Sequence, residues 1–397
     1  MLRIIIFLVG FLLLVFTEIL RVYYIMPFPG SQEEETLQLA YFIQNNIIWI
    51  RLLGLVLTVY PFYVIQMSAS KVIRITLWVL AGFYIVVFYM FNYRYLADRI
   101  FLPPKSVSFL AADQNTKVKP RQLVIGITIG SSSRAYPIEI IGYHHQVRDT
   151  VEGNLVMVTY CTVCRTGRVY VPEVGGKPET FRLVGMDHYN AMFEDSRTRS
   201  WWRQVSGEAV IGPLQGNALK EIPSEQMTLE AWIAGHPDTM ILQPASTFQE
   251  AYDDLSDYDE GTRKGRLTRR DSLSWKDKSW VVGVQIGLDA RAYDWNELVA
   301  TRVMQDVLGN TPILLTLLPD SMTFHTFNRV IDGDTLVFDK ASDLSFMHDT
   351  KTQSDWDLNG HCLEGSFKGK SLTPIQSYQE YWHSWRTFRP HSTAFNH

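Results

Sequence analysis

The 397-residue chain has only three cysteines, which limits what disulfides or thiolate clusters can contribute to its fold. Two of them form Cys161-x-x-Cys164, and because no second Cys-x-x-Cys accompanies this pair, the spacing does not support a zinc ribbon. The net charge is -4 and the polar part has no basic stripe, so nucleic-acid binding has no support. Phosphate-binding loops, Ser-His-Asp order and paired-carboxylate motifs are also absent. The cysteine pair is therefore the main candidate for chemistry.

Long apolar runs are concentrated in the first part of the chain. Segments at about 4–20, 47–66 and 73–92 approach the ~20 apolar residues that cross a ~30 Å hydrocarbon core. We expect a membrane region at 1–95 with a retained anchor, because no small-x-small cleavage site follows the first run.

Basic residues in the short loops predict the orientation of this region. Arg3, Lys71 and Arg74 favour a cytoplasmic N-terminus, whereas the loop after the first run carries acidic residues from Glu33 to Glu35. The prediction is an integral protein of the cell or inner membrane whose C-terminal domain is periplasmic or extracellular.

The remainder of the chain contains an internal repeat, seen as five blocks that recur in the same order at offsets of 153 to 157 residues. The clearest are "GITIGSSSRAYP" from Gly126 with "GVQIGLDARAYD" from Gly283, and "DSRTRSWW" from Asp195 with "DTKTQSDW" from Asp349. Apolar runs broken by Gly and Ser predict short strands joined by turns. We expect a mainly β (β-rich α+β) fold with tandem duplicated β-repeats in pseudo-twofold packing, preceded by three transmembrane α-helices.

The predicted division has a linker at 96–122, a first repeat at 123–245, a charged connecting segment at 246–278 and a second repeat at 279–397. The connecting segment is acidic and then basic, which is typical of a solvated arm. Ser224 is the predicted N-cap of a helix in the first repeat. Residues shared by both repeats are interpreted as scaffold: Arg134 and Arg291, Tyr136 and Tyr293, Trp202 and Trp356.

The cysteine pair occurs in the first repeat only, since "LVMVTYCTVC" corresponds to "TPILLTLLPDS" in the second. A bridge needed by the fold would be expected in both repeats, so this difference points towards function. In such a pair the first thiol often has a pKa lowered from ~8.5 into the range ~3.5 to 7.5. The residues "TGRVYV" after the pair predict a turn and a strand, unlike the helix of a thioredoxin site. A neighbouring cation must then stabilise the thiolate.

We interpret Cys161 and Cys164 as the nucleophile and resolving pair, with His144 as the proton donor and Arg165 as the local cation. The leading hypothesis is thiol-disulfide or thiol-peroxide exchange, with a protein thiol, a protein disulfide or a small oxidant as partner and no cofactor. The first alternative is a zinc or copper site formed by both thiolates, His144 and His188. The second is a structural or assembly module in which the cysteines form a local bridge.

The ordered blocks "RAYPIEII", "HHQVRDTVEGNLVMVTYCTVCRTG" and "DSRTRSWWRQVSGEAVIGPLQGNAL" resemble the bacterial and archaeal family known as domain of unknown function 3179. The resemblance covers roughly Val124 to Pro390 and leaves out the three apolar segments. This family is typically written Tyr-Cys-Pro-Leu-Cys-Gly-Thr-Gly, and some members carry selenocysteine in the motif. The resemblance therefore implies a redox-active nucleophile and no established activity. This chain departs from the pattern at Thr162, Val163 and Arg165.

Overall fold

The computed structural model describes residues 1–104, 106–339 and 346–395, so positions 340–345 and 396–397 of the predicted second repeat lie outside the described residues. The chain divides into two compact units. Unit 1 comprises Met1–Leu102, Glu179–Arg203 and Glu208–Ala218, and unit 2 comprises Pro103–Pro178, Gln204–Gly207 and Leu219–His397. Unit 1 therefore includes a piece from the middle of the chain.

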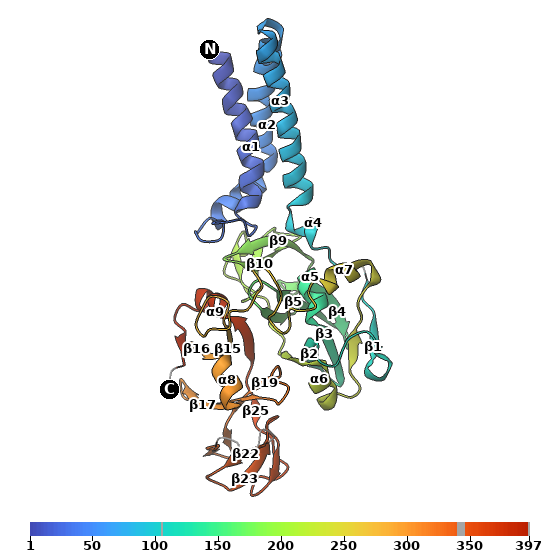
Figure 1. Ribbon diagram of the computed structural model, residues 1–397, viewed down its shortest axis with the longest axis vertical. Helices are drawn as coiled ribbons and strands as arrows, with labels where there is room; N and C mark the ends of the chain where they lie inside the picture. The colour runs from blue at the N-terminus through green and yellow to red at the C-terminus, as the bar shows by residue number, and fades with distance from the viewer. Residues whose placement is uncertain (105, 340–345, 396–397) are drawn as a thin grey trace. The chain divides into compact units, whose positions relative to one another are not determined.

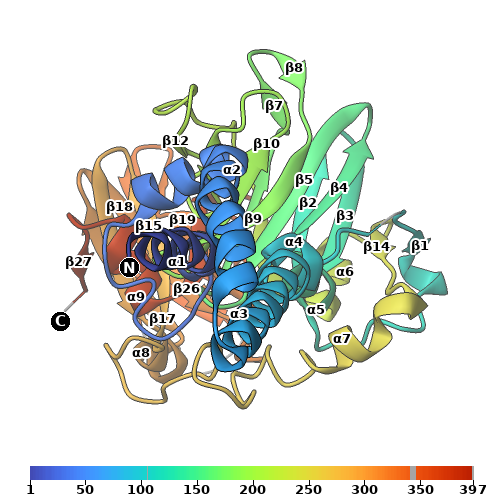
Figure 2. The same cartoon turned by 90° about the horizontal axis from the view of Figure 1, so that it is seen from above.

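Unit 1 contains the three apolar segments as long helices: α1 (Leu2–Tyr23), α2 (Leu37–Ser68) and α3 (Lys71–Tyr89), with a π-helical extension η1 (Met90–Arg94) and the short α4 (Ala97–Ile100). The three long helices are grouped together in both views (Figure 1, Figure 2). Each is long and apolar enough to cross a membrane, counting η1 with α3. The second begins at Leu37 rather than at 47, because its first turns are amphipathic and bury Ala40 and Ile43.

A buried polar network joins these helices. Arg51 donates to both carboxylate oxygens of Glu18, at 2.6 and 2.8 Å, and Glu18 is fully buried. Asn92 donates to Glu18 at 2.8 Å and accepts from Arg21 at 2.7 Å. Because a charge between apolar helices is stable only when it is paired and hydrogen-bonded, this network specifies how the three helices pack.

The rest of unit 1 is a small antiparallel sheet. Its order is β12-β11-β10-β9, formed by β9 (Phe181–Asp187), β10 (Asn190–Asp195), β11 (Trp201–Arg203) and β12 (Ala209–Ile211). Trp201 shares a buried cluster with Ile25 and Ala40 and meets the ring of Tyr41 edge-on, with centroids 5.1 Å apart. Apolar packing thus attaches this sheet to α2 and to the residues that follow α1.

Unit 2 contains two sheets that share the order of four strands, and the first sheet has β1 as an additional edge strand. The first is β1-β14-β3-β2-β13, formed by β1 (Phe109–Ala111), β2 (Leu123–Ile129), β3 (Ser132–Pro137), β13 (Glu225–Thr228) and β14 (Met240–Leu242). The second is β26-β15-β16-β27, formed by β15 (Trp280–Ile286), β16 (Asp289–Asp294), β26 (Ser377–Tyr381) and β27 (Thr393–Ala394). In each, an antiparallel hairpin is flanked by one antiparallel and one parallel strand. The sequence repeat is therefore a repeat of topology.

The other elements of the two copies also correspond. The sheet of β4 (Gln146–Val151), β5 (Asn154–Cys161) and β6 (Thr166–Tyr170) matches β17 (Val303–Leu308), β18 (Thr311–Leu317) and β19 (Phe324–Asn328), to which β25 (Thr373–Pro374) is added. Helices α5 (Ile138–His144) and α6 (Leu229–Gly235) match α8 (Trp295–Thr301) and α9 (Trp382–Phe388). The small sheet β9 to β12 matches β22 (Phe346–Asp349), β23 (Ser354–Asp357) and β24 (Cys362–Glu364). Minor elements are β7 (Glu173–Val174), β8 (Lys177–Pro178), β20 (Val330–Ile331), β21 (Asp334–Thr335), α7 (Gln249–Asp253), η2 (Ala112–Gln114) and η3 (Ser246–Phe248).

Shared residues have the same structural role in both copies, which explains why they recur. A Cβ on Gly126 would lie 2.3 Å from the ring of Trp232, and one on Gly283 would lie 2.1 Å from the ring of Trp385. Each glycine is needed because a tryptophan of the same copy packs directly on the strand.

The shared tyrosines likewise bond a carboxylate in each copy. Tyr136 donates to Asp149 at 2.8 Å, and Tyr293 donates to Asp306 at 2.6 Å. The predicted β-rich fold with three N-terminal apolar helices is confirmed. The predicted N-cap at Ser224 is wrong, because β13 continues to Thr228, and it is Thr228 whose hydroxyl accepts the N-terminal N–H of α6.

Equivalent residues of the two copies meet one another. Gln226 of β13 donates from Nε2 to Oε1 of Gln379, its counterpart in β26, at 2.8 Å. Ser224 exchanges two hydrogen bonds with the side chain of Gln376, at 3.0 and 2.8 Å. Contacts between equivalent residues are what a twofold relation produces. The pseudo-twofold arrangement itself stays a prediction.

Candidate functional site

The cysteine pair occupies the hairpin loop between β5 and β6. Cys161 ends β5 opposite Thr166, and the N–H of Cys164 donates to the carbonyl of Cys161 at 3.2 Å, which closes a β-turn. Arg165 follows with a φ of 57°, in the left-handed region that glycine adopts most easily. This conformation explains why the resembling family has glycine there. The predicted strand after the pair is confirmed, but the turn predicted at Thr166 and Gly167 is wrong, because β6 begins at Thr166 and the turn is formed by the residues from Cys161 to Arg165.

Both thiols are inaccessible to solvent. Cys161 and Cys164 are 0% exposed, and Val163 between them is 5% exposed. In the described part of the chain all three cysteines are thiols rather than disulfides. The ends of a β-turn lie within ~7 Å, and a disulfide spans ~4.4 to 6.8 Å between Cα atoms. The Cα separation typical of a β-turn thus overlaps the range that a disulfide spans.

Two side chains from outside the first copy reach this turn. Lys278, from the connecting segment, donates from Nζ to the carbonyl of Val163 at 2.6 Å and lies 3.1 Å from Nε2 of His383. His383, in α9 of the second copy, has Nε2 3.2 Å from the same carbonyl oxygen. An ammonium group only donates and a carbonyl oxygen only accepts, so these two contacts of Nε2 belong to opposite tautomers of the imidazole. Both side chains are half-buried.

Burial determines the charge of the groups at the turn. It lowers the pKa of Lys278 to about 8 and that of His383 to about 3, so the imidazole is neutral. Burial and the adjacent Cys161 raise the pKa of the Cys164 thiol well above its ordinary value, whereas the Lys278 ammonium and a hydrogen bond with Ser384 lower it. The thiol is therefore protonated at neutral pH, and Lys278 is the cation that favours its thiolate.

Arg165 directs its guanidinium to the second copy and the connecting segment. It donates to Oε1 of Gln379 at 2.7 Å and to the carbonyls of Tyr258 and Asp259 at 3.1 and 3.0 Å. Its Cζ lies 3.7 Å from the ring centroid of Trp280. Arg165 thus fastens the hairpin to its surroundings. Its predicted role as the local cation stays a prediction.

A second arginine of the hairpin forms a buried ion pair with the other copy. Arg168 in β6 pairs with Glu380 in β26, and both side chains are 0% exposed. The guanidinium also lies over the ring of Tyr378, 3.4 Å from its centroid. Because breaking a buried pair leaves one charge uncompensated, this contact holds the hairpin against β26.

The predicted histidines lie at the start of the same sheet. His144 ends α5, where its Nε2 is 2.7 Å from the hydroxyl of Tyr252 and its ring meets Phe248 edge-on. The carbonyl of His145 accepts from the N–H of Tyr160 at 3.1 Å, next to the first cysteine. Both histidines are buried, and burial lowers the pKa of His145 to about 4. The role of His144 as proton donor stays a prediction.

His188 belongs to unit 1. Its Nδ1 lies 2.7 Å from Oδ1 of Asp187, and this hydrogen bond raises its pKa, while Nε2 lies 3.6 Å from Glu35. Among the described residues, no three His, Cys, Asp or Glu side chains are grouped as a metal site. The site predicted from both cysteines, His144 and His188 stays a prediction.

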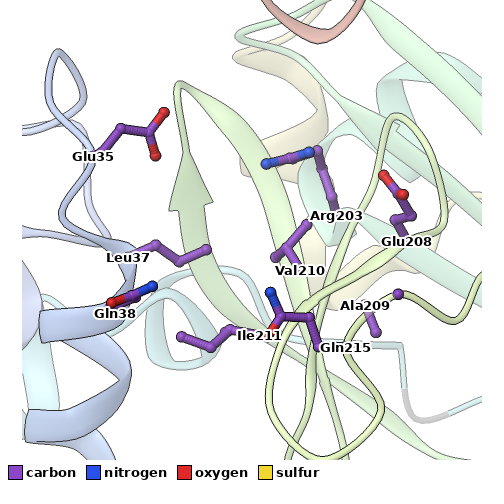
Figure 3. A pocket seen from close by; sticks show the side chains of 10 residues that line it. Glu35, Leu37, Gln38, Arg203, Glu208, Ala209, Val210, Ile211 and Gln215 are labelled. Atoms are coloured by element: carbon purple, nitrogen blue, oxygen red, sulfur yellow. The ribbon is translucent and has the colours of Figure 1, made fainter.

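Two cavities have no cysteine among their described lining residues. One of about 360 Å³ in unit 1 has Glu35 and Gln38 on one side and Arg203 and Glu208 on the other (Figure 3). One of about 810 Å³ lies between the two copies in unit 2 and includes Trp232 among its lining residues. The cysteine turn is thus covered by protein rather than open to either cavity.

Lys278, His383 and Ser384 were missed by sequence reasoning. Lys278 closes a connecting segment whose charges were interpreted as those of a solvated arm. The repeat contained one usable signal, because it aligns His383 and Ser384 with Glu230 and Ala231. Like the cysteines, this pair of residue types occurs in one copy only. That shared asymmetry could have connected His383 and Ser384 with the cysteine site.

Together these features define a β-rich protein with a duplicated sheet, three candidate membrane helices and a buried cysteine hairpin. Over residues 104–392 the chain matches the family described as protein of unknown function DUF3179. This match covers well over half of the chain, so the chain belongs to that family, and the resemblance seen in the sequence is confirmed. No curated protein and no solved structure matches the chain.

Proposed function

We propose that the protein is a membrane-anchored thiol redox protein in which Cys161 and Cys164 interconvert between two thiols and a disulfide. The observation that supports this most directly is the difference between the two hairpins of unit 2. The scaffold is present twice, but the thiols and the ammonium group bonded to their turn are present once.

The two hairpins align over their loops, although the left-handed residue is Arg165 in the first and Ser321 in the second. Cys161 pairs with Thr166 across the first loop, and the N–H of Leu318 donates to the carbonyl of Thr323 at 2.8 Å across the second. Both loops then have the same length, so Leu318 stands for the first cysteine and Ser321 for the second. A hairpin of this length is therefore stable without cysteines, which argues against a purely structural bridge.

The geometry supports two-electron chemistry. The β-turn places the two cysteines within disulfide range, and loss of two electrons and two protons to an oxidant joins their sulfur atoms. Lys278 favours the thiolate that begins this reaction, since its ammonium lowers the pKa of Cys164.

We further propose that this pair lies outside the cytoplasm. Lys71 begins α3 and Arg74 lies in its first turn, next to the short loop after α2, which favours a cytoplasmic position for that loop. The chain after α3 then continues on the opposite side of the membrane, where disulfides persist.

Thiol trapping across a redox titration tests the proposal. The full-length protein in detergent, with Cys362→Ser to remove the third thiol, is equilibrated in thiol-disulfide buffers, quenched with acid, denatured and labelled with a mass tag. Both cysteines should lose the label together, with a midpoint between about -120 and -270 mV. Cys161→Ser and Cys164→Ser should each abolish the transition.

A pair that keeps both labels in every buffer would contradict the proposal. A midpoint far below about -300 mV would instead indicate a structural bridge. Metal analysis of protein purified under reducing conditions tests the zinc or copper alternative on the same preparation.

A further inference from the structure

We infer that the pair reacts with small hydroperoxides, of which hydrogen peroxide is the simplest, and that the Lys278 ammonium protonates the departing hydroxide. This inference rests on the proposed redox function and narrows it from any disulfide or oxidant to one class of substrate. It also assigns a role to a residue of the connecting segment.

Burial of the turn selects the size of the oxidant. Exchange with a protein or glutathione disulfide passes through a mixed disulfide, which requires the attacking sulfur to be accessible to a bulky partner. Both thiols are 0% exposed, and Thr162 and Val163 between them are only 8% and 5% exposed. Hydrogen peroxide has two heavy atoms and needs little more space than a water molecule. It therefore needs the smallest opening of the structure among the oxidants considered, which is why we assign it to this turn.

The contacts of Lys278 identify the proton donor. Its Nζ is held 2.6 Å from the carbonyl of Val163, the residue between the cysteines, and 3.1 Å from Nε2 of His383. His383 is neutral because burial and the Lys278 charge lower its pKa to about 3, so the ammonium is the charged proton donor of this pair. The pKa of Lys278, lowered by burial to about 8, suits a group that gives up a proton near neutral pH.

The reaction balances with these groups alone. The thiolate sulfur attacks one peroxide oxygen, an S–O bond forms, the O–O bond breaks, and the departing hydroxide takes a proton from the ammonium to leave as water. The second thiol then attacks the sulfenic acid sulfur, the S–S bond forms, and a second water leaves. In sum, two thiols and one hydrogen peroxide give one disulfide and two waters. The first thiol releases one proton to solvent when it becomes the thiolate, and Lys278 takes one proton back from solvent at the end.

The second hairpin supports a chemical role for lysine at this position. Arg121 occupies the corresponding place before β2 and contacts that hairpin through Nη2, 3.7 Å from Sδ of Met322. An arginine keeps its proton at any physiological pH and cannot act as a proton donor. A cation packs on both hairpins, but only the one beside the thiols can lose its proton.

Oxidation rates of the full-length protein in detergent test the inference. In a Cys362→Ser background, loss of both thiols is followed by acid quench and mass tagging with hydrogen peroxide, cumene hydroperoxide, oxidised glutathione or an oxidised protein disulfide. Hydrogen peroxide should react at least a hundredfold faster than each bulky reagent. Its rate should rise with pH to about 8 and then level, because Lys278 loses its proton as the thiolate increases.

Variants at Lys278 separate proton donation from charge and from folding. Lys278→Met should lower the peroxide rate at least tenfold, and Lys278→Arg, which keeps the charge, should leave it low and still rising above pH 8. Lys276→Met, at an exposed lysine of the same segment, is the matched control and should change nothing. In the thiol-disulfide buffers of the redox titration, where equilibrium rather than rate decides the outcome, every folded variant should still form the disulfide reversibly.

The outcomes are distinguishable. A reversible disulfide in those buffers, together with oxidation by glutathione disulfide as fast as by hydrogen peroxide, would overturn the inference and leave the proposed function standing. A wild-type peroxide rate in Lys278→Arg would remove the lysine from proton donation. Failure of every oxidant to form a reversible disulfide would overturn both the inference and the proposed function.

Discussion

The hairpin between β5 and β6 and its counterpart between β18 and β19 each dock on the strand end that precedes a helix of the other copy. The N–H of Tyr381, just before α9, donates to the carbonyl of Cys164 at 2.9 Å. The N–H of Thr228, just before α6, donates to Oγ1 of Thr323 at 3.1 Å. The two contacts are reciprocal, so the duplicated scaffold presents two similar environments for a loop of the same length.

The two hairpin loops are stabilised by different hydrogen bonds. In the second copy, Oδ1 of Asp320 accepts from the N–H groups of Met322 and Thr323, both at 2.9 Å, and so stabilises its own turn. The first copy has Val163 at that position, and its carbonyl is bonded from outside by Lys278. The second turn is thus stabilised by a carboxylate of its own, whereas the cysteine turn is bonded by an ammonium group from the connecting segment. The site therefore depends on packing between the copies.

The largest expected effect tests that dependence. Glu380→Ala should lower the free energy of unfolding by about 3 to 5 kcal/mol, because it leaves Arg168 buried without its counter-charge. Urea unfolding of the full chain in detergent, followed by tryptophan fluorescence, measures this loss. Glu225→Ala is the matched control, since Glu225 is 50% exposed and 3.6 Å from His325, and should cost less than about 1 kcal/mol. Equal losses of unfolding free energy in the two variants would show that the buried ion pair at the first hairpin contributes no more than the exposed pair at the second.

The scaffold itself should respond in the same way in both copies. Gly126→Ala and Gly283→Ala each place a methyl group against a buried tryptophan ring, so each should cost about 1 to 3 kcal/mol. The same unfolding assay compares them. A loss confined to one variant would mean that the copies are not packed alike.

Alkylation should reveal the charge at the first hairpin. Burial raises the pKa of Cys164, so its thiolate increases with pH beyond the range of an exposed cysteine, and the rate with iodoacetamide should rise across that range. Lys278→Met removes the cation that lowers this pKa. The rate at pH 7.5 should fall on the order of fivefold, the equivalent of about 1 kcal/mol of charge interaction. Cys362, in the other copy, provides the internal control, and a parallel fall there would indicate a general loss of packing.

The smallest effect is expected from moving the motif. Leu318→Cys with Ser321→Cys, in a Cys161→Ser, Cys164→Ser background, places the pair on the second hairpin. The peroxide rate should stay at that of an ordinary thiol, because the cation there is Arg121. Mass tagging after peroxide treatment measures it. If the moved pair reacted with peroxide as fast as the native pair, the hairpin alone would be sufficient for the reaction, and the difference between Lys278 and Arg121 would have no chemical effect.

Sequence patterns predicted the features of this protein that depend on neighbouring residues. The three long helices follow from the length of apolar runs, and the strand after the cysteine pair follows from the alternating residues behind Gly167. The duplication was visible because Gly126 with its tryptophan recurs at nearly constant spacing. The structure adds the reason, which is direct packing of ring on backbone.

Adjacency in sequence does not decide which groups a side chain contacts, and the role of Arg165 as the local cation stays a prediction. Arg165 follows the cysteine pair directly, yet its φ of 57° and its bonds to Gln379, Tyr258 and Asp259 direct its charge to the scaffold. The start of α6 was misplaced for a related reason, since pairing of β13 with β2 extends the strand up to Thr228.

The sequence by itself determined that the chain has apolar helices, a duplicated β scaffold and cysteines in one copy, because each is encoded in residues close together or in exact recurrence. Only the tertiary structure decided what meets those cysteines. Lys278 and His383 lie 115 and 220 residues beyond Val163 in the chain, and both reach its carbonyl. They reach it because each hairpin packs against the other copy. Local sequence periodicity does not indicate which distant side chains this packing brings together.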